Sequence, residues 1–583
     1  MKAEERWQAR FRAPRMTLPV WARQAPHHAV YRCNTSGTWE VYAWDRATGH
    51  TRQVTDRPNG TAHGDVDPTG QWIWWFADTD GDEYGVWIRQ RFQGGPAQPV
   101  SVAPGYPCGL ALAANGTAAV GRACRNGFEV LLVNGADRPT LIYSHDEYAS
   151  VAGISLDGSL IAINHSEDGD SRHPSLRVLR ANGAVVGDLR DGNGKGVTGI
   201  RFAPVLGDRR LLVLHERRGR HEPLVWDPLT GEQREIYLRV PGEVTADWYD
   251  DGRSLLIMHN HRGRTELLKY DLTGGAMTPI DTPHGVIDAA APRPDGTVEY
   301  SWSSAAQAPV IRSSNGHVVM NPGPTAPPSV PLEDLDVDGP GGRIHALVSR
   351  PIGTPAPYPT VFLLHGGPSA QDDDSFQPHV AAWVDSGFAV IRINYRGSSG
   401  YGSAWRDALH GDVGHIELAD VTAVRDWVVN RGIADPERLV LAGSSWGGFL
   451  TLLGLGTQPK AWTAGIAAVP IADHTAAYED EAEGLRAYHR ALIGGSPAEL
   501  PERYTASSPI TYADMVQAPV LVLAGENDPR CPIRQIENYL EALTSEYHVY
   551  RYDAGHASRV VEERIRQMRT QIDFANRMLA HPD

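Results

Sequence analysis

Short hydrophobic runs separated by polar turns fill the chain from about residue 22 to residue 322, without a helix-period pattern. The repeating unit is an apolar strand, a glycine-containing turn, a second apolar strand, a polar loop and a third strand. The pattern repeats at the spacing of four-stranded propeller blades, and an earlier unit at residues 28–45 lines up with residues 72–88. It therefore predicts an all-β propeller of about seven blades, since two stacked β-sandwiches would need no such regular period. The turn glycines recur every 42–49 residues, at Gly70, Gly116, Gly158, Gly207, Gly252 and Gly296.

The pattern changes after residues 321–331, a segment with five prolines that predicts an extended linker. Beyond it, apolar strands alternate with amphipathic stretches, which is typical of a doubly wound, mostly parallel sheet. We therefore expect a propeller over residues 22–322 and an α/β domain over residues 323–583. We expect residues 1–21 to be an N-terminal extension, largely helical, that packs on the α/β domain.

A G-x-S-x-G motif covers residues 443–447, directly after the apolar strand RLVLA and before a helix-like stretch. In α/β-hydrolases this tight strand-to-helix turn exposes a serine hydroxyl, and its glycines let the turn close. Ser445 is then the nucleophile of an α/β-hydrolase domain. The motif also occurs by chance in many proteins, so its placement between strand and helix carries the prediction.

A serine nucleophile needs a base and a carboxylate that orients the base. In α/β-hydrolases these follow the serine along the chain in the order acid, then histidine. Asp528 follows the strand at residues 519–525, and His556 follows the strand at residues 547–553. The sequence therefore predicts a Ser445–Asp528–His556 triad. Alternatively, Asp528 opens an ordinary turn and His556 is one of 23 histidines without a special role.

Acyl transfer also needs hydrogen-bond donors that face the developing oxyanion. The H-G-G-P segment at residues 365–368 follows an apolar strand, and its glycines allow a backbone N–H to approach the reacting carbonyl. We expect the N–H groups of Gly367 and Trp446 to form the oxyanion hole. The alternative for H-G-G-P is a tight turn without a catalytic part.

Together, HGGP (365–368), NYRGSSGYG (394–402), GSSWGG (443–448), NDPRCP (527–532) and DAGH (553–556) resemble the prolyl oligopeptidase family of serine peptidases. The resemblance covers nearly the whole chain and is strongest to the acylaminoacyl-peptidase subgroup, which includes bacterial aminopeptidases, some of them similar to puromycin hydrolases. It implies that Arg530 binds a substrate carbonyl and that the propeller residue Glu83 pairs with it. A simple surface salt bridge is the alternative.

The family's propeller covers the active site, which implies short peptides or aminoacyl amides as substrates. An aminopeptidase must bind a free α-ammonium group with a carboxylate near the nucleophile. Glu83 is one candidate, and Glu479 in the acidic segment 478–483 is the other, although that segment is equally typical of a solvated helix face.

The remaining composition narrows the class of protein. A net charge of −16 opposes contact with phosphate backbones, so nucleic acid is not an expected partner. The N-terminus lacks the apolar core of a signal peptide, and the apolar runs are far shorter than the roughly 20 residues that cross a bilayer. The four cysteines form no C-x-x-C pair, so neither a disulfide framework nor a zinc site is indicated. We expect a cytoplasmic protein without membrane contact, metal or cofactor, and a homo-oligomer is compatible with the sequence.

The sequence thus predicts a serine exopeptidase of the aminopeptidase type, which acts through an acyl-enzyme on Ser445. Acylaminoacyl-peptidase, dipeptidyl-peptidase, oligopeptidase and carboxylesterase activities use the same triad and stay open. An inactive, propeller-based binding scaffold is the alternative from another class.

Overall fold

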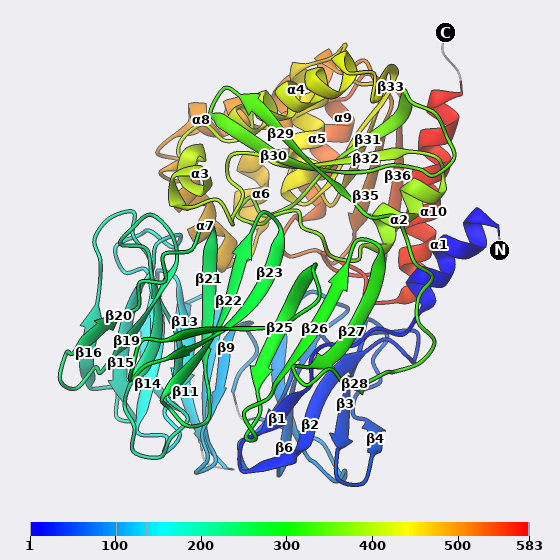
Figure 1. The fold of residues 1–583 in the computed structure, drawn as a ribbon. Coiled ribbons are helices and arrows are strands. Elements are labelled where there is room, and N and C mark those ends of the chain that lie inside the picture. Colours follow the sequence, from blue (N-terminus) through cyan, green and yellow to red (C-terminus); the bar gives the residue numbers. More distant parts are fainter. Residues whose placement is uncertain (1, 101, 136–137, 581–583) are drawn as a thin grey trace.

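The computed structural model describes residues 2–100, 102–135 and 138–580. A β-propeller lies face to face with an α/β domain, which is uppermost in Figure 1. Within the described residues, seven four-stranded sheets form the propeller and one eight-stranded sheet forms the centre of the α/β domain. The predicted fold class is confirmed.

Each propeller blade is an antiparallel meander of four consecutive strands. The strands of blades one to four are β1 (Val20–Ala22), β2 (Ala25–Cys33), β3 (Glu40–Asp45), β4 (His50–Gln53), β5 (Gly64–Val66), β6 (Trp72–Asp78), β7 (Gly85–Arg91), β8 (Gln98–Pro99), β9 (Tyr106–Leu112), β10 (Thr117–Cys124), β11 (Gly127–Asn134), β12 (Thr140–His145), β13 (Ala149–Ile154), β14 (Leu160–His165), β15 (Ser175–Arg180) and β16 (Val185–Leu189). Those of blades five to seven are β17 (Val197–Phe202), β18 (Leu211–His215), β19 (Glu222–Trp226), β20 (Gln233–Glu235), β21 (Glu243–Trp248), β22 (Ser254–His261), β23 (Arg264–Asp271), β24 (Met277–Ile280), β25 (Val286–Pro292), β26 (Val298–Ser304), β27 (Gln307–Ser313) and β28 (Val318–Met320).

The first strand of every blade contributes to a channel along the propeller axis. In blades two to seven, the turn after this strand contains one of the periodic glycines, each with a positive φ that favours glycine. The period in the sequence is therefore that of one repeated hairpin. The first blade lacks this glycine, and its strand β1 begins at Val20, two residues before the boundary that we placed at residue 22.

The α/β domain is built on a sheet with the strand order β29-β30-β32-β31-β33-β34-β35-β36. The pairs β29–β30 and β30–β32 are antiparallel, and the other neighbours are parallel. The strands are β29 (Glu333–Gly339), β30 (Gly342–Ser349), β31 (Tyr358–Leu364), β32 (Ala389–Asn394), β33 (Ala434–Ser444), β34 (Ala464–Ala468), β35 (Val520–Gly525) and β36 (Tyr547–Tyr552). The helices are α1 (Ala3–Arg12), α2 (Pro378–Asp385), α3 (Ser403–Arg406), η1 (Asp407–Leu409), α4 (His415–Asn430), α5 (Trp446–Thr457), α6 (His474–Asp480), α7 (Glu483–Ile493), α8 (Pro501–Ser507), η2 (Pro509–Met515), α9 (Ile533–Ala542) and α10 (Val561–Leu579).

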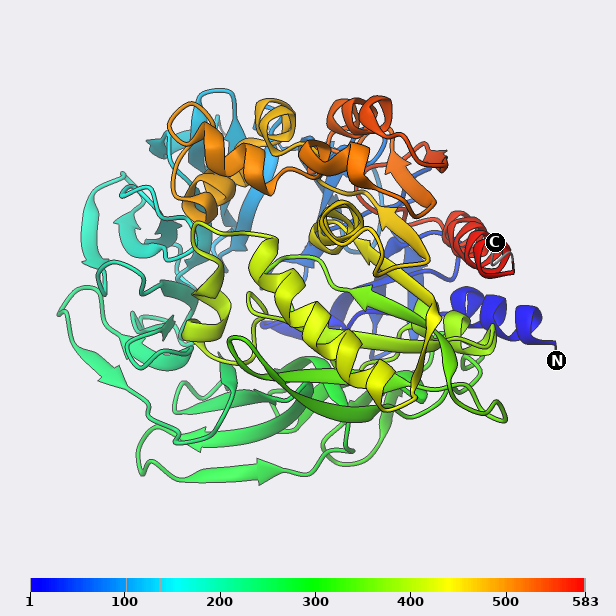
Figure 2. The ribbon, with the colours of Figure 1, turned by 90° about the horizontal axis from the view of Figure 1, so that it is seen from above.

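Two hydrophobic clusters cover the two faces of this sheet. One contains buried side chains of α4, α5 and α9, and the other contains those of α1, α2 and α10. Trp7 and Phe11 lie one helical turn apart on α1, so both enter the second cluster. Helix α1 runs beside α10 in both views of the ribbon (Figures 1 and 2). None of the described helices is both long enough and apolar enough to cross a membrane.

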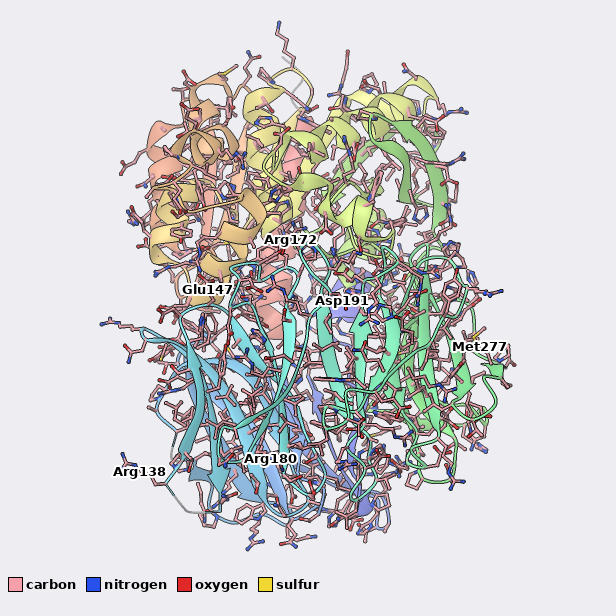
Figure 3. All side chains as sticks on the ribbon, turned by 90° about the vertical axis from the view of Figure 1, so that its left-hand side faces the viewer. Arg138, Glu147, Arg172, Arg180, Asp191 and Met277 are labelled. Carbon is pink, nitrogen blue, oxygen red and sulfur yellow. The ribbon has the colours of Figure 1, made fainter. Side chains whose placement is uncertain are left out.

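Ion pairs join the two domains on the side opposite α1. Arg172 of the propeller binds Asp407 at 2.6 Å, and Glu147 binds Arg490 of α7 at 2.9 Å. Both propeller residues lie at its upper edge, facing the α/β domain, in Figure 3. Arg406 is almost fully buried there and binds the buried Glu216 of the propeller. Because a buried charge is costly without its partner, this pair resists separation of the domains.

We expect Arg406→Ala to lower the free energy of unfolding by about 3 kcal/mol, because the buried Glu216 carboxylate loses its guanidinium partner. The control is Arg12→Ala, whose partner Glu562 is about half exposed, as is Arg12 itself. Such an exposed pair contributes less than about 1 kcal/mol. Urea unfolding followed by tryptophan fluorescence measures both, and equal losses in the two variants would contradict the expectation.

Candidate active site

Ser445 lies on the turn between β33 and α5, with φ 56° and ψ −118°. This positive φ is strained for a residue with a side chain. The surrounding backbone is packed so closely that it requires glycine. A Cβ on Gly443 would lie 2.3 Å from the Gly447 carbonyl oxygen, and a Cβ on Gly447 would lie 2.1 Å from that of Leu364. The turn therefore has the strained serine expected from the motif, with the Ser445 side chain half-buried.

The other two predicted triad residues, Asp528 and His556, lie next to each other. Asp528 follows β35, His556 follows β36, and both strands are parallel to β33, so all three loops leave the same edge of the sheet. His556 Nδ1 donates to Asp528 Oδ2 at 2.8 Å. Asp528 Oδ1 accepts from the backbone N–H groups of Arg530 and Cys531 at 2.8 and 3.0 Å. The carboxylate thus keeps the imidazole proton on Nδ1. This leaves Nε2 of His556 unprotonated and able to accept a proton.

In the described part of the chain, no hydrogen bond joins Ser445 Oγ to His556. Such bonds are often long in unliganded enzymes and tighten only when substrate is bound. The order of the loops and the His556–Asp528 bond are therefore the geometric support for the triad.

A propeller loop packs directly on the loops that carry Asp528 and His556. A Cβ on Gly555 would lie 2.0 Å from the Gly81 carbonyl oxygen, so the two backbones touch. Asn527 donates a hydrogen bond to the Asp80 carbonyl oxygen at 3.3 Å. The propeller therefore covers this edge of the sheet and limits the space in front of the site.

The H-G-G-P segment passes alongside Ser445. A Cβ on Gly366 would lie 3.3 Å from the Ser445 Cβ, which shows how close the segment runs to the nucleophile. Within the described residues, neither the Gly367 N–H nor the Trp446 N–H has a backbone acceptor. Both predicted donors are thus available to an oxyanion.

The structure adds two supporting residues that the sequence motifs did not identify by role. Tyr395 donates its hydroxyl proton to the His365 carbonyl oxygen at 2.7 Å and stacks on the His365 ring at 4.3 Å between centroids. Ser398 is 2.8 Å from His365 Nε2. Burial lowers the pKa of His365 to about 4, so its ring is neutral at physiological pH. Residues 394–402 therefore hold the H-G-G-P segment (365–368), here called the oxyanion segment, in place.

Glu417 of α4 supports the serine turn from the other side. It is fully buried and accepts a hydrogen bond from Trp446 Nε1 at 3.1 Å and another from the Gly414 N–H at 2.7 Å. Burial raises the pKa of Glu417 to about 8. Tyr395 lies in the NYRGSSGYG segment, but its role follows only from its contact with His365, and Glu417 belongs to none of the quoted motifs.

The two predicted carboxylates near the site differ in their partners. Glu83 binds Arg530 through two contacts, Nη2–Oε1 at 2.9 Å and Nε–Oε2 at 3.0 Å, so the predicted pair is formed across the domain interface. Glu479 instead binds Arg534 of α9 at 2.7 Å, an arginine that Asp480 also binds, and its side chain is 59% exposed. The structure thus brings Glu83, and not Glu479, into contact with the turn that carries Asp528.

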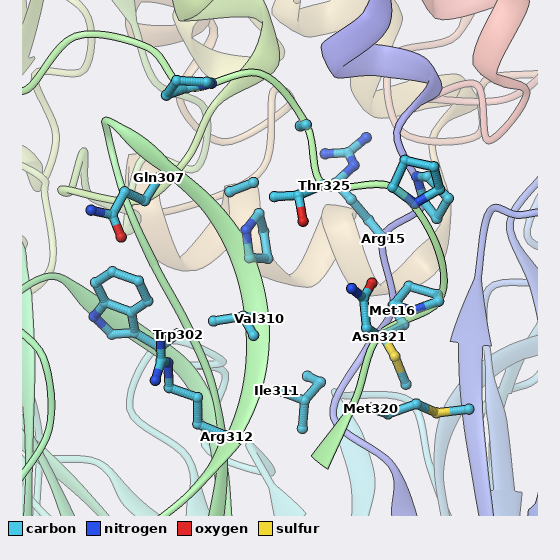
Figure 4. A pocket seen from close by; sticks show the side chains of 17 residues that line it. Arg15, Met16, Trp302, Gln307, Val310, Ile311, Arg312, Met320, Asn321 and Thr325 are labelled. Carbon is cyan, nitrogen blue, oxygen red and sulfur yellow. The ribbon is translucent and has the colours of Figure 1, made fainter. Parts of the chain in front are cut away.

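A separate cavity lies between the N-terminal segment, the last blade and the linker (Figure 4). Arg15, Trp302 and Arg312 are among the residues that line it, whereas none of the triad or oxyanion residues does. This cavity is therefore distinct from the candidate active site.

The buried Glu417 predicts a pH dependence of stability. An unfolded glutamate has a pKa of about 4.3, and the higher pKa in the fold means that the folded state holds the proton more tightly. Its contribution is complete below about pH 4.3 and is lost as the pH rises toward about 8, by at most about 1.4 kcal/mol per pH unit. We expect Glu417→Gln, which cannot ionise, to lose this dependence. Urea unfolding at several pH values between 5 and 8 measures it, and an unchanged slope in the variant would count against a neutral Glu417.

Residues 374–582 match the model of the prolyl oligopeptidase family. Dipeptidyl peptidase family member 6 of Caenorhabditis elegans is 27% identical over 251 residues, 41% of this chain and 34% of that protein. The acylamino-acid-releasing enzyme of Arabidopsis thaliana is 33% identical over 199 residues, 32% of this chain and 25% of that protein. The chain thus spans about a third or less of the length of these curated relatives.

The fold of the whole chain is similar to that of solved structures. One is a puromycin-hydrolyzing peptidase of Mycobacterium tuberculosis, with a TM-score of 0.82, 19% identity, and coverage of 100% of this chain and 96% of that chain. At this identity the likeness shows the fold alone. The sequence match to the prolyl oligopeptidase family covers residues 374–582, which lie within the α/β domain of this chain.

Proposed function

We propose that this protein is a serine peptidase of the aminopeptidase type, which cleaves N-terminal aminoacyl amide bonds of short peptides or of aminoacylated small molecules such as aminonucleoside antibiotics. The observation that carries the proposal is the His556–Asp528 hydrogen bond, together with a half-buried serine in a strained turn. The similarity to a dipeptidyl peptidase family member and to acylamino-acid-releasing enzymes supports amide-bond hydrolysis.

In the proposed mechanism, His556 Nε2 accepts the Ser445 hydroxyl proton as Oγ attacks the carbonyl carbon. The oxyanion that forms is stabilised by the N–H groups of Gly367 and Trp446. His556 then donates its proton to the leaving amine, which leaves an acyl-enzyme on Ser445. Water, activated by His556, then attacks the acyl-enzyme in the same way and releases the carboxylic acid from Ser445. Asp528 orients the imidazole and stabilises its charged form in both steps.

The contact between the domains supports a limit on substrate size. Because the Gly81 loop of the propeller touches the Gly555 loop beside His556, we infer that the propeller keeps folded proteins away from Ser445 while the domains stay together. Short peptides and small aminoacyl amides fit this constraint.

The Arg530–Glu83 pair supports recognition of the substrate's amino end. Arg530 is half exposed beside the turn of Asp528, so its guanidinium can donate to a substrate carbonyl. A carboxylate has more acceptor sites than Arg530 fills, so Glu83 can also accept from an α-ammonium group. Glu479, already bound by Arg534, is the less favoured candidate.

The first test uses nitroanilides of alanine, proline and O-methyltyrosine, each with a free and an acetylated amino group. We expect wild type to cleave the free-amino forms and Ser445→Ala to lose activity on the order of 10⁶-fold, because no nucleophile remains. Release of nitroaniline followed by absorbance gives kcat and KM for each substrate.

Each rival function has its own outcome in this panel. Preference for the acetylated forms would make the protein an acylaminoacyl-peptidase, which the similarity to acylamino-acid-releasing enzymes also favours. Cleavage of dipeptidyl nitroanilides alone, of internal peptide bonds, or of simple esters alone would indicate a dipeptidyl-peptidase, an oligopeptidase or a carboxylesterase. A fluorophosphonate probe that fails to label Ser445 would indicate an inactive scaffold.

The two carboxylates are separated by a matched pair of variants. We expect Glu83→Gln to lower kcat/KM for free-amino substrates about 10-fold, equivalent to about 1.4 kcal/mol of lost charge interaction, and to affect acetylated substrates less. Glu479→Gln should stay within about twofold of wild type, since its carboxylate is held by Arg534. The opposite result, with Glu479→Gln impaired and Glu83→Gln normal, would reassign the ammonium site.

A further inference from the structure

A buried cysteine lies beside the candidate triad. Cys531 is three residues after Asp528, is 2% exposed and donates its backbone N–H to Asp528 Oδ1 at 3.0 Å. Burial raises the pKa of the Cys531 thiol well above its usual value, and Asp528 and Ser445 are both close enough to affect it. The thiol is therefore protonated at neutral pH and behaves there as a small apolar group.

The side chains of Asp528, Cys531 and His556 converge. One ligand atom from each of the three lies within 4.8 Å of the other two. A thiolate, an imidazole and a carboxylate are the ligands that Zn²⁺ takes in proteins, at about 2.3 Å for sulfur and about 2.0–2.2 Å for nitrogen and oxygen. Around a tetrahedral ion such ligand atoms are roughly 3.3–3.6 Å apart. Side-chain shifts of about 1 Å would therefore suffice to close the three groups around an ion.

The second such cluster in the described residues is less suited to a cation. It consists of His27, His28 and Asp45 on the propeller and includes no thiol. His28 is already engaged, since its Nδ1 is 2.8 Å from the Gly70 carbonyl oxygen and its ring stacks on Phe92. Only the cluster at Cys531 combines a soft ligand with two buried members.

We propose that Asp528, Cys531 and His556 form an inhibitory site for a thiophilic divalent cation of the Zn²⁺ type. On binding, the Cys531 thiol releases a proton to solvent, the single imidazole proton of His556 moves through solvent from Nδ1 to Nε2, and the cation takes the position between the imidazole and the carboxylate. His556 is then held as a metal ligand and no longer serves as the base for Ser445. The inhibition is reversible, because chelation of the cation restores the Cys531 thiol proton and the Nδ1–H tautomer of His556.

The three ligands come from two loops that are far apart in sequence, so they do not form a zinc-binding motif that could be recognised along the chain. Asp528 and Cys531 follow β35, and His556 follows β36. The cation reaches them by the route of the substrate, because the His556 side chain is 14% exposed beside Ser445 while the two other ligands are buried.

The activity test titrates Zn²⁺ against wild type, Cys531→Ser and Cys124→Ser, with a fluorophosphonate label to confirm that each variant is folded at the active site. We expect the concentration for half-inhibition to rise at least 10-fold in Cys531→Ser and to stay at the wild-type value in Cys124→Ser, a propeller thiol outside the cluster. EDTA should restore activity. Equal sensitivity of Cys531→Ser and wild type would overturn the proposal, and Cys531→Ala repeats the measurement if the serine variant does not fold.

A binding test is independent of the proposed peptidase activity. Co²⁺ added to Ser445→Ala should give a thiolate-to-cobalt charge-transfer band that saturates at one equivalent, and the band should be absent from the double variant that also has Cys531→Ser. The band would support the metal site even if the nitroanilides were not cleaved. Failure to observe it, with or without inhibition by Zn²⁺, would overturn the assignment of Cys531 as a ligand.

Discussion

Direct contact between backbones, possible only at glycine, fixes the candidate active site. Gly447 touches the carbonyl oxygen that ends β31, which positions the serine turn against the oxyanion segment. Gly555 touches Gly81, which positions the histidine loop against the propeller. Any side chain at these positions would separate the parts by more than a hydrogen bond allows. The geometry of the site therefore depends on both domains.

Hydrogen bonds between polar side chains also hold the parts of the candidate site in position. The serine turn is connected to α4 through the Trp446 indole and Glu417, and the oxyanion segment is connected to Tyr395 and Ser398. The Trp446–Glu417 bond is buried and the bonds of His365 are partly buried, so loss of one partner leaves the other without its hydrogen bond. These contacts make the arrangement rigid before a substrate arrives.

Much of the architecture was predictable because it rests on local patterns. The glycine turns mark one hairpin in six blades, and the triad order follows from loops that leave one edge of a parallel sheet. The role of Glu417 was not predictable, because it lies 29 residues from Trp446 and no motif joins them. The choice between Glu83 and Glu479 likewise depended on their partners, and only the fold shows that Glu479 is bound by Arg534.

The two chain segments that join the domains lie next to each other. Arg10 of α1 donates hydrogen bonds to the Pro327 and Pro328 carbonyl oxygens of the linker, and the cavity of Figure 4 lies between these segments and the last blade. The ion pairs of Arg172 and Arg406 lie on the opposite side. The two covalent connections between the domains thus lie at one edge of their interface, and the ion pairs of Arg172 and Arg406 lie at the opposite edge. Any separation of the two domains would therefore be widest at the edge far from the covalent connections. The more exposed ion pairs at that edge would weaken as ionic strength rises.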